Sequence, residues 1–324
     1  MVIAMLVFAL TAALVVAMQS EFSRLFARSA GVLITAQAQA YLRGAEDLAT
    51  MALLADYDKD QLSQKRDDLT EIWAQEAAPY ALDEGGWMTG SLEDLQGRFN
   101  LNTLTPPTRK PQSGQFRYTP HQAQFIRLLQ ALGEPELSDY EAIAITDAIG
   151  DWLDKDTQPS PEGAEDDFYF SRDPPHRAAN RDMSSASELL AVANVTPELY
   201  LALAPLVTVL PPDVKTLNIH TASGTLLRSI NSDKDLTPLS ESEAESLVEF
   251  REENGFADVK ALMAHPVFAG KTDIGDTEKL LGESTAYFLL SAELDLAQRN
   301  MRLYSVLHRD NREIKALARA SGSL

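Results

Sequence analysis

The sequence has no cysteine, which excludes disulfide bonds, thiolate metal ligands and thiol nucleophiles. Basic residues are few: 28 Lys and Arg stand against 48 Asp and Glu, and the formal net charge is −20. A surface of this sign repels a phosphate backbone, so general nucleic-acid binding is disfavoured. The chain also lacks the P-loop, G-x-G-x-x-G, G-x-S-x-G and H-E-x-x-H motifs, and its five histidines show no zinc-ligand spacing. We therefore expect a protein that is not an enzyme.

The N-terminal segment has no charged residue before Glu21 and is an apolar run over residues 1–18. A helix of this length can just span a hydrocarbon core of about 30 Å, because each residue adds about 1.5 Å. From Glu21 to Asp56 there is no proline, and apolar residues recur at helical spacing. We expect one continuous helix, with residues 1–20 in the membrane and residues 21–56 outside the cytoplasm. A secretory signal peptide is the alternative, but the basic n-region that it requires is missing.

Two segments far apart in the chain carry strand signals. Gly85-Gly86 between short segments at 80–83 and 87–95 predicts a hairpin. Alternating residues near the C-terminus predict a second hairpin with its turn at 297–300. A sheet that is interrupted by an insertion fits this order.

Between the two hairpins, the positions of proline and glycine and of helix-capping residues predict a block of helices. Ser138 with Glu141 forms a capping box, and Thr196 stands before Pro197 at a helix start. The proline-rich residues 105–120 are expected to form a linker. Residues 57–72 are highly charged and are expected to form a solvated helix or loop.

Carboxylates flank a loop rich in proline and glycine, and they are Asp151, Asp154, Asp156, Glu165 and Asp166. Counted from Asp154, Asp156 is third and Glu165 is twelfth, as in an EF-hand, but Pro159 stands at the sixth position, where that loop needs glycine. The loop is therefore not an EF-hand, although Ca²⁺ takes about 6–8 oxygens and tolerates irregular geometry. On the residues alone, a calcium site and a solvated acidic loop both stay open. A carboxylate pair for hydrolysis is less favoured, because no clear apolar pocket accompanies it.

Several stretches together resemble one known family, the minor pseudopilin K of the bacterial type II secretion system (general secretion pathway protein K). They run in the family's order across most of the chain: 92–102 (LEDLQGRFNLN), 151–156 (DWLDKD), 163–166 (GAED), Tyr169, 177–180 (RAAN), 187–189 (SEL) and 217–223 (LNIHTAS). One departure is His220, where the family usually has Asn.

The resemblance implies an α+β fold of the pilin-like kind, in which a long N-terminal helix packs on an antiparallel sheet. It also implies a large all-α domain inserted in that sheet. We expect residues 57–104 and 280–324 to form the pilin-like part and residues 105–279 the insertion. The insertion is expected to contain two SAM-like helical subdomains, at about 105–210 and 213–279.

The resemblance also implies one or two Ca²⁺ ions at the acidic loop. The residues that match the family's acidic positions, and are therefore the expected ligands, are Asp154, Asp156, Glu165 and Asp166, with Asp151 and Asn180 as further candidates. The implied partners are the minor pseudopilins I and J, with minor pseudopilin H and the major pseudopilin G as further candidates, and the inner membrane. The implied location is the bacterial inner membrane, crossed once, with the bulk of the chain in the periplasm and no nucleic-acid partner.

Two N-terminal residues bear on the place of the subunit in a filament. Met1 is expected to be the processed and N-methylated terminus. Met5 stands where most pilin-like subunits have a glutamate that can pair with a neighbour's N-terminal amine. An unpaired buried charge in lipid costs at least about 2–3 kcal/mol, and a tip subunit has no neighbour above it to neutralise. An apolar Met5 therefore favours a place at the tip.

The resemblance thus implies a structural tip subunit that initiates and caps the periplasmic pseudopilus driving protein export. A membrane-anchored protein for nucleic-acid uptake is the alternative, because Asn218–Ser223 before a helix resembles the start of a helix-hairpin-helix module. However, the Gly-hydrophobic-Gly hairpin of such modules is missing nearby, and the net charge has the wrong sign.

Overall fold

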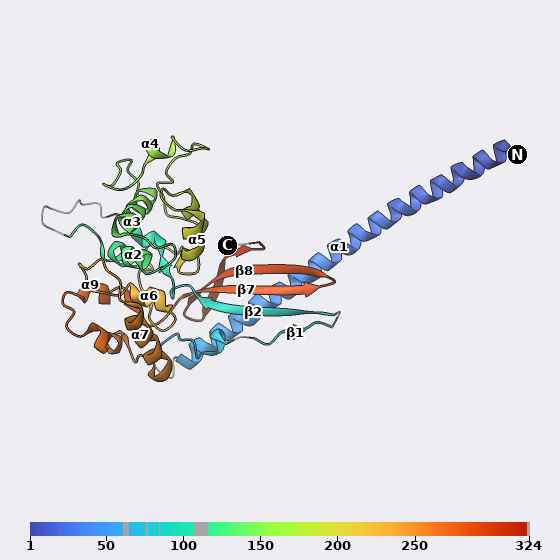
Figure 1. Ribbon diagram of the computed structural model, residues 1–324. Helices are drawn as coiled ribbons and strands as arrows, with labels where there is room; N and C mark the ends of the chain where they lie inside the picture. Colours follow the sequence, from blue (N-terminus) through green and yellow to red (C-terminus); the bar gives the residue numbers. More distant parts are fainter. Residues whose placement is uncertain (61–64, 76, 84, 107–115, 323–324) are drawn as a thin grey trace.

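The computed structural model describes residues 1–60, 65–75, 77–83, 85–106 and 116–322. Three parts are visible in Figure 1: a long N-terminal helix, a sheet packed along its C-terminal half, and a helical domain. The N-terminus lies at the free end of the long helix, and the helical domain lies at the opposite end of the molecule. The expected fold class is confirmed: a pilin-like fold with a helical insertion in its sheet.

The long helix α1 (Val2–Asp60) is unbroken, as predicted. Its first part is exposed, and from Ala38 onward one face is buried against the sheet. The buried apolar positions recur at helical spacing and are mostly alanine: Ala38, Leu42, Ala45, Ala49 and Leu53. Small side chains on this face allow the strands to approach the helix closely.

The main sheet has five antiparallel strands in the order β1-β2-β7-β8-β9. Their bounds are β1 (Tyr80–Ala81), β2 (Gly86–Asp94), β7 (Tyr287–Leu296), β8 (Arg299–Asp310) and β9 (Glu313–Ala320). Every second residue of β7 is buried, from Phe288 to Leu296, because strand side chains alternate between the faces. Both predicted hairpins are confirmed. The sequence analysis did not predict β9, because none of its residues is buried and the apolar alternation is weak.

The rest of the chain between β2 and β7 is mainly helical. Its α-helices are α2 (Pro120–Gln130), α3 (Asp139–Leu153), α4 (Asp166–Tyr169), α5 (Pro197–Leu203), α6 (Gly224–Arg228), α7 (Glu241–Asn254), α8 (Val259–Met263) and α9 (Gly275–Glu278). Its short 3₁₀ helices are η2 (Leu101–Leu104), η3 (Ala186–Ala191) and η4 (Pro266–Phe268), whereas a further one, η1 (Ile72–Ala74), lies earlier, between α1 and β1. This part of the chain also contains two short pairs of parallel strands: β3 (Phe99–Asn100) with β4 (Val207–Thr208), and β5 (Leu217–Asn218) with β6 (Leu281–Gly282).

The predicted caps of these helices are confirmed. Ser138 and Glu141 form a reciprocal capping box at α3, and the Thr196 side chain accepts from the backbone N of Leu199 at the start of α5. α7 ends at Gly255, whose φ of 67° favours glycine. The expected linker at 105–120 falls largely on residues 107–115, outside the described part of the chain.

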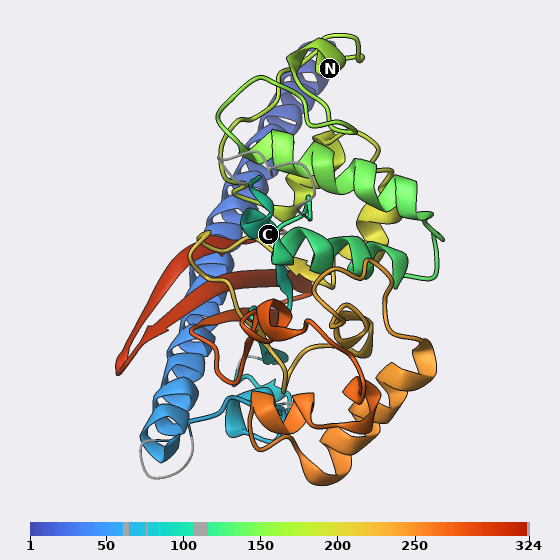
Figure 2. The same cartoon turned by 90° about the vertical axis from the view of Figure 1, so that its left-hand side faces the viewer.

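The described residues form two hydrophobic cores, one between α1 and the main sheet and one inside the helical domain. Figure 2 shows the two halves of that domain, with α2 and α3 in green beside the later helices in orange. One core runs through both halves. It also takes in Phe99, Leu101 and Leu104 before the expected start at 105, and Leu281 beyond the expected end at 279. These residues belong to the insertion because β3 and β6 pair with strands of the insertion rather than with the main sheet.

The expectation of a solvated segment at 57–72 is wrong for four of its five carboxylates. Asp60, Asp67, Asp68 and Glu71 are all buried. Asp67 pairs with Arg309 of β8, a strand at the far end of the sequence. A highly charged composition predicts solvation only when no distant partner is available, and here the partner is a residue that sequence spacing cannot reveal.

Candidate functional site

The acidic loop joins α3 to α4 at the outer end of the helical domain (Figure 1). Asp154 is the C-cap of α3, and its Oδ1 accepts from the backbone N of Asp156 at 3.1 Å. Oδ1 of Asp156 in turn accepts from the backbone N of Gln158 at 2.8 Å. These local bonds turn both carboxylates toward the same side of the loop, and Asp154, Asp156 and Glu165 each bring an oxygen within 4.8 Å of the others.

Glu165 is the most unusual member of this group. Only 4% of the residue is exposed, yet neither Oε1 nor Oε2 has a hydrogen-bond partner in the described part of the chain. Asn180 adds a further oxygen: its Nδ2 donates to the backbone O of Asp156 at 3.0 Å, while its buried Oδ1 has no partner among described residues. Buried polar atoms are nearly always satisfied in proteins by protein, water or an ion, so these three oxygens are available to a ligand.

The remaining predicted ligands already have other contacts. Both carboxylate oxygens of Asp151 accept from the backbone N of Ser160, at 3.1 and 2.9 Å. A Cβ at Gly163 would lie 1.9 Å from Oδ2 of Asp151, so this close approach requires glycine. Oδ1 of Asp166 accepts from the backbone N of Ala178 at 3.1 Å. Both oxygens of Asp151 are therefore engaged within the loop, and Asp166 is not among the grouped carboxylates, whereas Asp154, Asp156 and Glu165 bring oxygens together and Glu165 and Asn180 have buried oxygens without described partners.

The electrostatics of the loop agree with this division. Burial, followed by repulsion from the surrounding carboxylates, raises the pKa of Glu165 to about 7. Burial raises the pKa of Asp151 to about 6 despite its bonds to Ser160. A divalent cation between like charges would remove this cost. The donor set is made of oxygens only, which is what a hard cation such as Ca²⁺ prefers, so the residues fit the implied ion.

A second group of polar residues joins the helical domain to the main sheet. Asn218, fully buried on β5, donates to Oδ2 of Asp94 on β2 at 2.8 Å and to the backbone O of Asp67 at 2.9 Å. Asp94 also accepts from Thr221 Oγ1 at 2.6 Å and from the backbone N of Gln96 at 2.7 Å. Burial raises the pKa of Asp94, although these donors favour its charged form. The resemblance marked both stretches, but only the structure shows that they meet.

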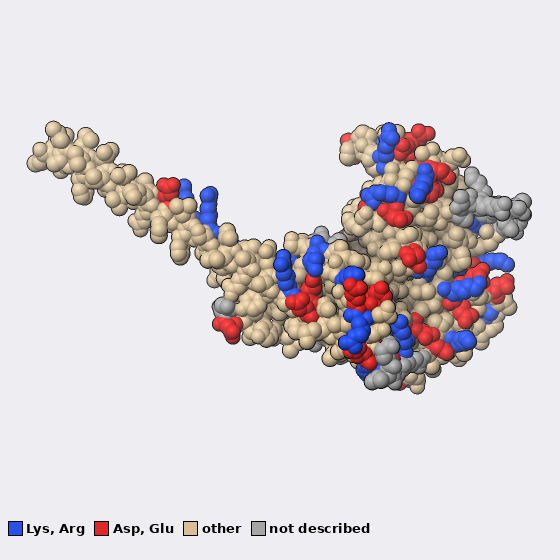
Figure 3. All heavy atoms as spheres, turned by 180° about the vertical axis from the view of Figure 1, so that it is seen from behind, with Lys and Arg blue, Asp and Glu red and all other residues tan. Residues whose placement is uncertain are grey.

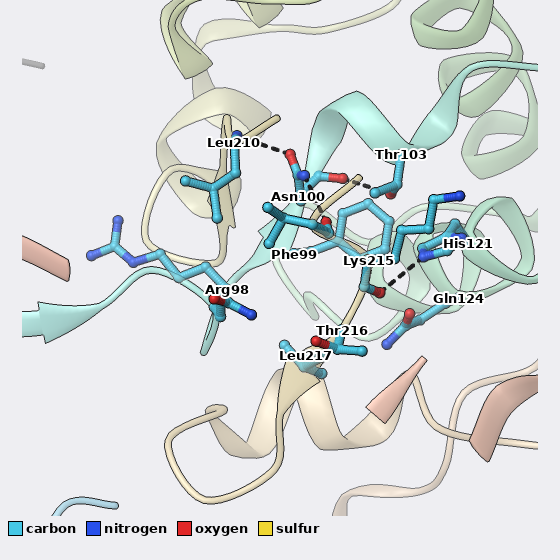
Figure 4. A pocket seen from close by; sticks show the side chains of 12 residues that line it. Arg98, Phe99, Asn100, Thr103, His121, Gln124, Leu210, Lys215, Thr216 and Leu217 are labelled. Atoms are coloured by element: carbon cyan, nitrogen blue, oxygen red, sulfur yellow. Dashed lines mark hydrogen bonds between the residues drawn. The ribbon is translucent and has the colours of Figure 1, made fainter. Parts of the chain in front are cut away.

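Asn100 and Asn102 play a similar part inside the helical domain. Figure 4 shows Asn100 beside Leu210, whose backbone N donates to Asn100 Oδ1 at 3.0 Å. Asn102 Nδ2 donates to the backbone O of Met183 and of Leu210. The cavity next to Asn100 has a volume of about 10 Å³, which is room for about one water molecule. The two asparagines therefore link segments of the helical domain, and the cavity beside Asn100 is not a ligand pocket.

His220 lies in the same stretch as Asn218 and is buried. Its backbone N donates to Asn218 Oδ1 at 3.1 Å. Burial lowers the pKa of His220 to about 4, so its ring is neutral near pH 7. A neutral buried imidazole is compatible with a position where the family usually has Asn.

The N-terminal residues Met1 and Met5 lie on the exposed part of α1, far from the acidic loop. By length and composition, α1 is apolar enough to cross a membrane, and its apolar window is not buried. Figure 3 shows the outermost part of the stem without charged side chains on the visible face, whereas charged side chains appear further along the stem and the head carries both signs.

Comparison with known sequences gives a consistent result. Residues 97–212 and residues 217–282 each match a sequence model described as type II secretion system (T2SS), protein K. Type II secretion system protein K of Aeromonas hydrophila is 34% identical, over 84% of this chain and 81% of that protein. The protein of the same description from Pseudomonas aeruginosa is also 34% identical, over 91% of this chain and 83% of that protein.

A solved structure is similar over nearly the whole chain. It is the crystal structure of the GspK–GspI–GspJ complex from the enterotoxigenic Escherichia coli type 2 secretion system. The matched chain superposes with a TM-score of 0.76 at 25% identity, covering 92% of this chain and 100% of the other.

Proposed function

Because this chain belongs to the family of type II secretion system protein K, we propose that it is a minor pseudopilin, a structural subunit without enzymatic activity. It is held in the inner membrane by a single helix, with its bulk in the periplasm. It assembles with the minor pseudopilins I and J, and H and the major pseudopilin G are further candidate partners. It initiates and caps the pseudopilus that drives protein export.

The observation that carries this proposal is the stem of α1. Beyond the first 20 residues, its large apolar side chains are still exposed, and they include Phe22, Leu25, Phe26, Val32 and Leu33. A helix with exposed apolar residues on this scale needs partners, and parallel stems of other subunits can provide the same kind of surface. The N-terminal part of α1 suits both lipid and a bundle of such stems.

The position of the helical domain supports a place at the tip. It lies at the end of the molecule away from the N-terminus, next to the main sheet (Figure 1). In a filament built from parallel stems, a further subunit stacked above this one would need the same space. An apolar Met5 agrees with this place, since a subunit without a neighbour above gains nothing from a carboxylate there.

The assembly role can be tested with the full-length chain in detergent, co-expressed with pseudopilins I and J. We expect all three to purify together. Phe26→Ser should weaken this association at least about tenfold, because it removes an exposed apolar contact from the stem. The matched control Arg24→Ser, on the same turn of the helix, should keep it.

Two results would contradict the proposal. Labelled chains distributed along the length of pseudopili, rather than one at an end, would exclude the cap. Micromolar binding of duplex DNA at low salt would favour the nucleic-acid alternative. Nucleic-acid binding by this stretch is disfavoured, because Asn218 and His220 are buried and form hydrogen bonds within the protein.

The second part of the proposal is that the acidic loop binds one or two Ca²⁺ ions. Asp154, Asp156, Glu165 and Asn180 would hold the ion, with water and backbone carbonyls completing its shell. Glu165 and Asn180 would use the buried oxygens that have no described partner. The bound ion would supply positive charge between α3 and α4 and so stabilise the loop. No step of a reaction depends on it.

Removing calcium should destabilise the helical domain. Chelation is expected to lower its unfolding free energy by about 2 kcal/mol, because a ligand bound only to the native state stabilises it. Glu165→Gln should abolish the response to chelator in this domain, whereas Asp167→Asn, an exposed neighbour, should preserve it. Calorimetry with and without chelator measures both. An unchanged melting temperature, together with metal analysis that finds no calcium, would defeat this part of the proposal.

A further inference from the structure

A second group of carboxylates lies where α1 ends, well away from the acidic loop. Asp56 and Asp60 lie on the last turns of α1, and Glu71 is the N-cap of η1. Each offers an oxygen, and the three oxygens lie within 4.8 Å of one another. The residues are only 1%, 6% and 7% exposed. Nothing in the proposed function uses them.

Asp56 keeps a buried oxygen without a partner. Its Oδ2 accepts from Arg309 Nη1 at 3.0 Å, whereas its Oδ1 is buried and has no partner in the described ranges. Glu71 uses Oε2 to accept from the indole Nε1 of Trp73 at 2.8 Å and from the backbone N of Asp68 at 3.1 Å. An unpaired buried oxygen of Asp56 therefore lies in a group with two further buried carboxylates.

Among the described residues here, buried carboxylates outnumber buried basic side chains. Arg309 is buried and pairs with both Asp56 and Asp67. Lys59 is exposed, and its charge acts on Asp56 and Asp60. Arg66, which is half-buried, pairs with Asp68. The sequence of residues 61–64, Gln-Leu-Ser-Gln, adds no charged side chain. Burial raises the pKa of Glu71 to about 7 and that of Asp60 to about 6, and the neighbouring carboxylates raise both further.

We propose that Asp56, Asp60 and Glu71 bind a Ca²⁺ ion, distinct from the ion of the acidic loop. Carboxylate oxygens are hard donors, and Ca²⁺ accepts an irregular shell that water can complete. The ion would join the end of α1 to the segment that leads into the main sheet. Through Arg309 and Asp67 it would also be coupled to β8 and to Asn218 of the helical domain. It would brace the point where stem, sheet and insertion meet.

The test uses the full-length chain in detergent, in a parent variant whose acidic loop is disabled by Asp154→Asn and Glu165→Gln. We expect this parent to retain one bound Ca²⁺ by equilibrium dialysis with metal analysis. Its melting temperature should rise by about 5 °C in saturating Ca²⁺. Tb³⁺ in place of Ca²⁺ should luminesce when tryptophan is excited, because Trp73 contacts Glu71 directly.

Matched variants of the parent separate the outcomes. Asp60→Asn and Glu71→Gln should each lose the bound ion, whereas Asp58→Asn, whose side chain is 44% exposed, should retain it. Trp73→Phe should lose the Tb³⁺ signal and still bind one Ca²⁺, which controls for variants that fail to fold. A folded parent without bound Ca²⁺ would overturn the proposal, and so would preferential binding of Mg²⁺. Neither result affects the tip role, which is tested by co-purification.

Discussion

Replacing Asp94 with alanine is expected to lower the free energy of unfolding by about 4 kcal/mol. Asp94 is buried on β2 and accepts from Asn218, Thr221 and the backbone N of Gln96. Alanine would leave these three donors without their acceptor, and a hydrogen bond to a charged group is worth about 1.5–3 kcal/mol. Relief from burying a carboxylate offsets part of the loss. Chemical denaturation of the full-length chain in detergent measures the difference.

This change should also uncouple the two cores. The contacts of Asp94 link the main sheet to the helical domain, so calorimetry of Asp94→Ala should show the helical domain melting as a separate transition. Asp94→Asn retains one acceptor oxygen and should lose about half as much stability. Glu93→Ala is the surface control, since that side chain is 47% exposed. A single unshifted transition for Asp94→Ala would show that the cores are joined by other contacts.

Replacing Arg127 with methionine is expected to cost about 3 kcal/mol. Arg127 is fully buried on α2 and donates to three backbone oxygens between α6 and α7: those of Ser229 at 2.6 Å, Ser232 at 3.0 Å and Asp235 at 2.7 Å. Each carbonyl left unsatisfied costs about 1–3 kcal/mol. Methionine fills a similar volume and removes a buried charge, so the net loss is smaller than the sum of the three.

The helical domain should respond as a whole, because Arg127 joins its two halves. Arg127→Lys keeps the charge but cannot reach three carbonyls with a planar fork, and it should recover only part of the stability. Arg181→Met, whose side chain is 56% exposed, is the control. A loss in Arg127→Met no greater than in this control would show that the halves are held by their shared core alone.

The parts of the fold that were predictable depend on residues close in sequence. The caps at Ser138 and Thr196 involve residues three positions apart. The hairpin between β7 and β8 was predicted from alternation, although its turn residues Ala297 and Gln298 both take positive φ without glycine or asparagine. The unbroken α1 followed from the absence of proline.

What could not be predicted depends on partners far away in the chain. The charged composition of residues 57–72 predicted exposure to solvent, but Asp67 is buried in an ion pair with Arg309. The acidic loop was located from sequence, but the different contacts of its carboxylates were not. Asp151 accepts hydrogen bonds within the loop, whereas both carboxylate oxygens of Glu165 lack a described partner. Asp94 and Asn218 are 124 positions apart, and no periodicity connects them.

The length of α1 has a mechanical consequence. The sheet holds this helix from Ile34 onward, so its first 32 helical residues, about 48 Å at about 1.5 Å each, form a free arm. With about 30 Å in the bilayer, the sheet would stand about 18 Å above the membrane surface. A tilt of about 10° where the sheet holds α1 would move the N-terminus by about 8 Å. Small adjustments at the head would thus be amplified into displacements at the membrane.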